Sequence, residues 1–162
     1  MFTRDGLKAF HRWTHDSLDV LLRHASTMPA ALLIKEVPGF ARPDIRAQLV
    51  HILRCEAAWV RGLQHLPLEP WPPDFFPTVE SLVEARRRVE AGTLAYLDSL
   101  SETELNTRLE QVPDDWVGPR QSPAFIVHHV LTHAFHHKGQ VVAMCRILGQ
   151  PAPDTDMQRE AV

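Results

Sequence analysis

The stretch HHVLTHAFHHKGQ, residues 128–140, guides the interpretation of the rest of the chain. It holds five of the ten histidines and no proline, and it continues as VVAMCRIL before Gly149 and Pro151. A glycine followed shortly by a proline is a strong helix-stop signal. Serine before proline, as at 122–123, suits the first turn of a helix. The sequence therefore predicts one long helix from about Ser122 to Leu148.

Two of these histidines share the apolar face of that predicted helix. At 3.6 residues per turn, His133 and His137 lie about 40° apart around the axis. The apolar residues on the same face are Ile126, Val130 and Met144. His129 and His136 border this face. His128 lies far from it, and we expect it to be exposed to solvent.

Histidines on an apolar face need polar partners, because a buried imidazole without one is costly. One interpretation is that they are edge residues or hydrogen-bonded core residues. The other is a shared metal ion, bound by neutral imidazole nitrogens, with a third ligand from elsewhere. His51 is the main candidate; the pair His11 and His15 is another. Cys55, one turn after His51, could bind as a thiolate, and periodicity alone does not decide among them.

The composition excludes several classes of function. The chain has 162 residues, of which 44% are hydrophobic and 23% charged, and we expect a single domain over residues 1–162. The net charge of −3 gives no reason to expect nucleic acid as a partner. The basic cluster Arg86–Arg88 is flanked by Glu84 and Glu90, which favours a solvated helix face.

The cysteine content and the lack of long apolar runs indicate a cellular location. Cys55 and Cys145 are far apart and form no CxxC pair, so no disulfide framework is expected. The N-terminal sequence lacks the apolar region of a secretory signal, and no apolar run is long enough to span a membrane. We expect a cytoplasmic protein with no membrane partner.

Apolar residues at helical intervals predict three further long helices. They cover residues 4–25, with Asp5 as a candidate N-cap; about 44–65, after Pro43; and 78–100, with Thr78 as a candidate N-cap and Ser81 as a second candidate. Ser101 with Glu104 resembles a capping box for a short helix. Proline-rich connections separate the helices, and in residues 66–77 the aromatics Trp71, Phe75 and Phe76 are expected to pack on the body. The fold class expected is all-α, a four-helix bundle with long connections.

A family resemblance rests on two of these segments. HILRCEAAW, residues 51–59, followed about eighty residues later by H-x3-H-x2-HH-K-G-Q, resembles the DinB-like superfamily. This superfamily includes DNA-damage-inducible proteins of Gram-positive bacteria and thiol-dependent S-transferases. The stretch EVPGF before residue 41 and LGQPAPDTD near the end also look familial. The resemblance covers most of the chain.

The resemblance implies a bundle that holds one divalent metal ion, zinc or nickel, by three histidines. These map onto His51, His133 and His137, whereas His136 stands where no ligand is required. Members with a defined activity bind a low-molecular-weight thiol, such as bacillithiol or mycothiol, and transfer it to an electrophile. The function expected is therefore a metal-dependent S-transferase; alternatives are a hydrolase that uses metal-bound water and a non-catalytic stress-response protein. A homodimer is also expected.

Four polar residues are candidates to orient the metal-binding histidines through hydrogen bonds: Glu56, Gln140, His136 and His15. Glu56 lies on an apolar helix face, where it could instead make an interhelical hydrogen bond or pair with an arginine. Gln140 could equally be a structural amide. No catalytic residue is assigned.

Overall fold

The computed structural model describes residues 1–112, 116 and 118–156. These residues form six α-helices, one short 3-10 helix and no β-strand, which confirms the all-α prediction. The elements are α1 (Arg4–Thr27), α2 (Ala30–Leu33), α3 (Ile45–Leu63), η1 (Pro73–Phe75), α4 (Val79–Ser99), α5 (Glu102–Asn106) and α6 (Pro123–Ile147). None of these helices combines the length and the hydropathy that a bilayer-spanning segment needs.

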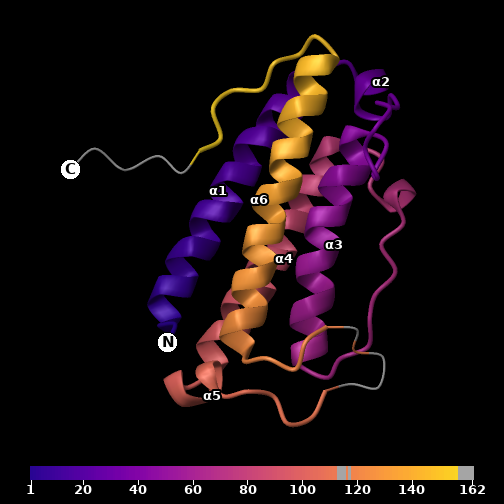
Figure 1. Cartoon of the computed structure of the whole chain (residues 1–162). Coiled ribbons are helices and arrows are strands. Elements are labelled where there is room, and N and C mark those ends of the chain that lie inside the picture. Colours follow the sequence, from indigo (N-terminus) through magenta and orange to yellow (C-terminus); the bar gives the residue numbers. More distant parts are fainter. Residues whose placement is uncertain (113–115, 117, 157–162) are drawn as a thin grey trace, which may run out of the picture.

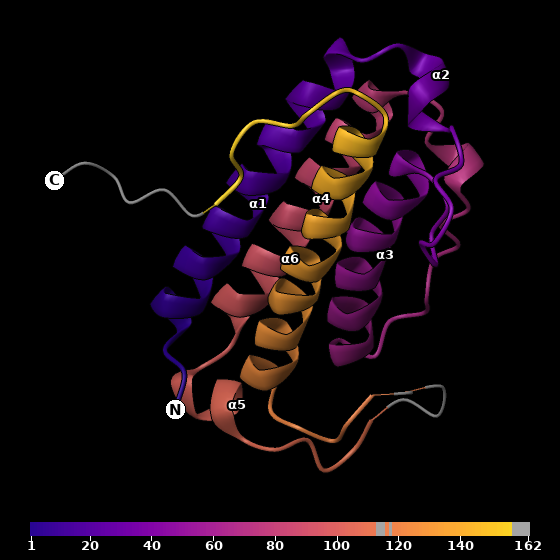
Figure 2. The same ribbon diagram turned by 45° about the horizontal axis from the view of Figure 1, so that its top comes forward.

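The four long helices α1, α3, α4 and α6 form a bundle (Figure 1). Helices α1 and α6 run in one direction, and α3 and α4 run in the other. Each of α1 and α3 packs against both α4 and α6, so α1 and α3 lie diagonally across the bundle (Figure 2). The connection from α3 to α4 runs back along the bundle, which makes these two helices parallel. The expected bundle with long connections is confirmed.

The predicted N-caps explain most of the helix starts. Side-chain oxygens accept hydrogen bonds from backbone N–H groups at the starts of α3, α4, α5 and α6; the residues are Asp44, Thr78, Ser101 and Ser122. The prediction for α1 is wrong. Its cap is Thr3, whose hydroxyl accepts from the N–H of Gly6 at 3.1 Å, and Asp5 lies inside the first turn.

A polar layer divides the core of the bundle. Two apolar clusters occupy the two ends, one containing Leu21, Leu49, Leu82 and Met144 and the other Leu7, Leu97, Leu105 and Ile126. Between them along the helices lie buried polar side chains: His11, His15, Glu56 and Thr93. Helices α1, α3 and α4 therefore each contribute to one buried polar cluster near mid-height.

Two local predictions need correction. Phe75 is 65% exposed, whereas Trp71 and Phe76 stack on each other and are buried. Arg86 is buried rather than solvated, because it reaches from α4 to the backbone carbonyl of His15 on α1. The chain after α6 packs against α1 and α6, because Ser17 and Lys138 both donate to the backbone carbonyl of Thr155.

Candidate metal centre

The packing of α3 against α6 brings the three expected histidines together. The two helices are antiparallel. The ring of His51 on α3 lies beside those of His133 and His137, which are one turn apart on α6. Ring centroids are 5.1 Å apart for His51 and His133, 4.5 Å for His51 and His137, and 4.4 Å for His133 and His137. This arrangement could hold a metal ion between two helices.

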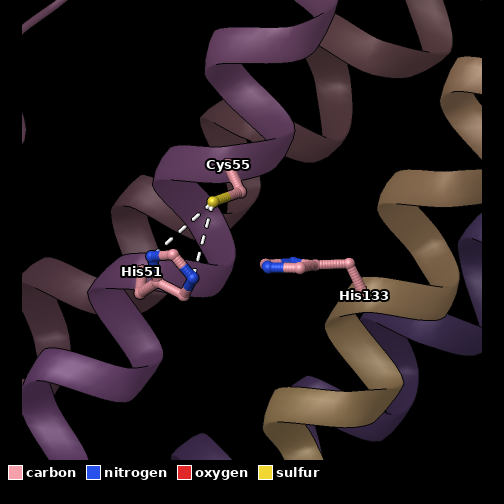
Figure 3. A group of neighbouring side chains, drawn as sticks. All are labelled: His51, Cys55 and His133. Atoms are coloured by element: carbon pink, nitrogen blue, oxygen red, sulfur yellow. Dashed lines mark hydrogen bonds between the residues drawn. The ribbon is translucent and has the colours of Figure 1, made fainter. Parts of the chain in front are cut away.

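Cys55 lies at the same place. Figure 3 shows Cys55 and His51 on α3, with the ring of His133 reaching across from α6. Donor atoms of these three residues all lie within 4.8 Å of one another. The structure therefore adds a thiol to the histidines, with the ring of His137 beside both His51 and His133.

A chain of hydrogen bonds fixes the orientation of His137. Its Nδ1 lies 2.8 Å from Oε1 of Gln48, and an amide oxygen only accepts, so Nδ1 carries the proton. The Gln48 amide donates in turn to Oε1 of Gln140 at 2.6 Å and to the carbonyl of Arg42 at 3.4 Å. Gln140 donates to Nε2 of His136 at 2.9 Å. The lone pair on Nε2 of His137 is consequently free for a metal.

The surroundings keep these imidazoles neutral. Burial is the main cause that lowers the pKa of His51 to about 4, and His137 and Arg42 add to it. Burial likewise lowers the pKa of His133 to about 4, with His137 contributing, and it lowers the pKa of His137 as well. Burial raises the pKa of the Cys55 thiol, against the opposing effect of Arg54. Neutral imidazole is the form that binds metals.

A cleft opens beside His51 and Cys55. Its volume is about 330 Å³, and its walls combine two exposed arginines with aromatic and aliphatic side chains. The residues that line it include Arg42, Arg54, Trp59, Leu66 and Leu68. Gly62 allows the ring of Trp116 to pack closely in the wall of the cleft, because a Cβ at position 62 would lie 2.7 Å from that ring. A concave, mostly apolar site with a few polar groups is typical of small-molecule binding.

The other histidines of α6 differ from one another. His129 and His136 are exposed, as expected for residues that border the inward face. His128 is half-buried, so the prediction of an exposed side chain is wrong. Its ring packs near Phe2 and Phe10, with centroids 5.2 and 5.9 Å away, because α6 also packs against α1 on that side.

Glu56 and His15 belong to a separate cluster with His11, in the polar layer of the core. The carboxylate of Glu56 accepts from Nε2 of His11 at 2.7 Å, from Nε2 of His15 at 3.0 Å and from the hydroxyl of Thr93 at 2.7 Å. His11 and His15 are fully buried, and Glu56 is 1% exposed. Burial alone would raise the pKa of Glu56, but His15 and the hydrogen bonds bring it below its ordinary value.

Donor atoms of His11, His15 and Glu56 also lie within 4.8 Å of one another. The hydrogen-bond directions nevertheless disfavour a metal there. Nη1 of Arg86 lies 3.4 Å from Nδ1 of His15, and since a guanidinium only donates, Nδ1 is the acceptor. Nε2 of His15 then carries the proton, which points at Glu56 and leaves no lone pair for an ion.

Sequence reasoning did not find Gln48, Thr93 or the two cleft arginines. Gln48 precedes His51 by three residues, so its place on the same helix face was a usable signal. Thr93 carried no such signal, because its partner Glu56 is 37 residues away on another helix.

Comparison with known proteins agrees with this fold. A family model described as the DinB family matches residues 1–161. This chain belongs to the DinB family. A solved structure of a conserved protein from Enterococcus faecalis is similar, with a TM-score of 0.67 and 18% identity, over 92% of this chain and 99% of that one. At that identity the likeness shows the fold alone. None of the curated proteins matches this DinB family chain.

Proposed function

We propose that this DinB family protein is a metal-dependent enzyme that transfers a low-molecular-weight thiol to an electrophile. The observation that carries the proposal is the meeting of His51, His133 and His137 beside an open cleft. The resemblance of the same three residues to the ligands of thiol-dependent S-transferases supports it. Bacillithiol or mycothiol is the proposed co-substrate.

The donor set fits a borderline-soft divalent ion such as zinc or nickel. Imidazole nitrogen suits both, and three neutral histidines leave coordination positions for another ligand. Gln48 holds Nε2 of His137 free, and burial favours neutral His51 and His133. When bound, such an ion supplies one effect, the stabilisation of a thiolate at neutral pH.

The chain's own residues would bind and orient the substrates. Arg42 and Arg54 place positive charge beside His51 and Cys55, which favours a thiol or electrophile that carries a carboxylate. Trp59, Leu66 and Leu68 provide apolar surface for the rest of the molecule; both leucines are exposed without a ligand. The cleft therefore suits a small, partly apolar anion.

The test is turnover by metal-loaded protein. Protein loaded with zinc or nickel is mixed with a low-molecular-weight thiol and monochlorobimane, and the fluorescent conjugate is measured. We expect conjugation above the uncatalysed rate, abolished in His133→Asn and retained in His65→Asn. His65 is exposed and has a φ of 54°, which asparagine tolerates, so the same substitution there is a matched control.

Absence of turnover with every thiol tested would contradict the transferase but not the metal site. A hydrolase or a non-catalytic metal-binding protein would then be the better description. A homodimer and a role in the stress response stay predictions that rest on the resemblance. A cytoplasmic location stays a prediction that rests on the cysteine content and the lack of long apolar runs.

A further inference from the structure

Two pairs of metal-binding residues face each other across the α3–α6 interface. Each pair has a spacing of four residues, which places both side chains on one helix face about one turn apart. His51 and Cys55 form the pair on α3, and His133 and His137 form the pair on α6. Figure 3 shows His51 and Cys55 on α3 with the ring of His133 reaching toward them from α6, and the ring of His137 lies 4.5 Å from that of His51.

The distance between the donor atoms of Cys55 and His51 suits a shared ion. The sulfur of Cys55 lies 3.6 Å from Nδ1 and 3.7 Å from Nε2 of His51. Zinc binds imidazole nitrogen at about 2.0 Å and thiolate sulfur at about 2.3 Å, so tetrahedral angles place the two donors about 3.5 Å apart. The sulfur is nearly equidistant from both ring nitrogens, so rotation of the His51 ring decides which nitrogen would face the ion.

We propose that Cys55 is the fourth protein ligand of the metal centre, which makes the donor set three imidazoles and one thiolate. The inference rests on the metal site of the proposed function and deepens it. On binding, the S–H bond of Cys55 breaks, a sulfur–metal bond forms, and the proton leaves to solvent through the cleft that Cys55 lines. A soft thiolate favours zinc over harder divalent ions.

A fourth protein ligand changes how the site receives a substrate. Four protein ligands are the mark of a closed zinc site, whereas three leave a position open. An external thiol would therefore compete with Cys55, and it would do so on the cleft side. The alternative is that Cys55 only makes a weak S–H hydrogen bond to His51 within α3.

Cobalt substitution separates these two possibilities without any measurement of activity. Cobalt(II) bound to a thiolate gives an intense near-ultraviolet charge-transfer band, and its weaker visible bands report binding itself. We expect the charge-transfer band in the unchanged chain and in Cys145→Ser, and its loss in Cys55→Ser while the visible bands remain. Cys145 is the matched control, because it is the chain's other cysteine and is buried in the apolar core.

Two further measurements test whether Cys55 binds the metal, and a third checks that the variant is folded. Zinc affinity should fall by at least about tenfold in Cys55→Ser, since loss of even an outer hydrogen-bond partner of a ligand costs about 10–100-fold. Zinc binding at neutral pH should also release one proton fewer from Cys55→Ser than from the unchanged chain. Circular dichroism and thermal unfolding of the apoprotein check that the serine variant is folded.

Identical charge-transfer spectra in the unchanged chain and Cys55→Ser, with cobalt bound in both, would overturn the role of Cys55. The three-histidine site and the transferase would survive that result. Failure of the unchanged chain to bind cobalt or zinc would overturn the metal site as well.

Discussion

Two histidine clusters of this protein look alike in sequence and differ in structure. His11 and His15 on α1 have the same spacing of four residues as His133 and His137 on α6. The first pair is fully buried around an anionic Glu56, whose oxygens accept three hydrogen-bond donors. The second pair lies near a half-exposed His51, a thiol and a cleft.

A spacing of four residues between histidines therefore does not by itself identify a metal site. In the core cluster the imidazole N–H groups donate to the carboxylate of Glu56, and Arg86 donates to Nδ1 of His15. In the α3–α6 cluster, Nδ1 of His137 donates a hydrogen bond to Oε1 of Gln48, which leaves the lone pair on Nε2 of His137 available. The core cluster therefore joins helices, and the α3–α6 cluster is the one suited to bind an ion.

The largest expected effect is on metal content. His133→Asn should reduce the zinc that stays bound from about one ion per chain to near zero, because it removes one of the imidazoles that hold the ion between α3 and α6. The apoprotein should unfold at nearly the same temperature as before, since His133 is half-exposed. Elemental analysis after dialysis measures the first effect and thermal unfolding the second. Unchanged zinc stoichiometry would refute the ligand assignment.

Glu56→Gln should lower the stability of the protein without a change in its zinc content, the reverse of His133→Asn. Removing the charge from a buried, hydrogen-bonded carboxylate should cost about 3 kcal/mol of unfolding free energy. For a chain of this size that is a fall of about 6–12 °C in melting temperature. Zinc stoichiometry should not change. Glu84→Gln, at an exposed position on α4, is the matched control, and loss of zinc from Glu56→Gln would mean that the two clusters are not separate.

The destabilisation should depend on pH. Glu56 has a pKa below its ordinary value in the folded protein, so its contribution is fully present above the unfolded pKa of about 4.3. That contribution is lost as the pH falls below this value. Urea unfolding should therefore show that the difference in unfolding free energy between the unchanged chain and Glu56→Gln becomes smaller from pH 7 to pH 3. If this difference in unfolding free energy stays constant with pH, the charge of the carboxylate is not the cause of the destabilisation.

A smaller effect is expected for Gln48, which acts through His137. Gln48→Met keeps the volume of this buried side chain but accepts no strong hydrogen bond, so zinc affinity should fall about 10–100-fold. Gln48→Glu should restore it, because a carboxylate also accepts from Nδ1. Competition titrations with a chelator measure the affinity, and Gln64→Met on the exposed end of the connection is the control. If the unchanged chain and the three variants bind zinc with equal affinity, Gln48 does not orient His137.

The smallest effect concerns the cleft. Arg54→Glu should raise the KM for a carboxylate-bearing thiol about fivefold, the size expected for an exposed charge pair. The kcat, and the KM for an uncharged thiol, should change little. Arg87→Glu is the control, because Arg87 is exposed on α4 and does not line the cleft. The same rise for both thiols would exclude recognition of the carboxylate.

Local signals in the sequence were enough to predict the helices and part of the site. Caps such as Asp44, Thr78 and Ser122 depend on residues two or three positions away, so they can be identified without tertiary structure. The inward direction of His133 and His137 follows from the period of one helix. The choice of His51 came from the resemblance, because it lies off the apolar stripe of its own helix.

What could not be predicted depends on contacts between distant segments. His128 was expected in solvent because the periodicity of the helix predicts only one inward face. In the structure, α6 packs against α1, α3 and α5. Arg86 was expected to be solvated because its partners on α1 are about 70 residues away in sequence. Glu56 was correctly placed in an apolar face, but its partners across the bundle were not visible from the sequence.

The most direct test of the central claim is the position of the metal. Anomalous diffraction at the zinc edge, from crystals of the zinc-loaded protein, locates the ion without assumptions about chemistry. We predict one anomalous peak per chain, enclosed by His51, His133 and His137, with Cys55 in contact. A peak among His11, His15 and Glu56, or no peak in the α3–α6 cluster, would contradict this assignment of the metal ligands.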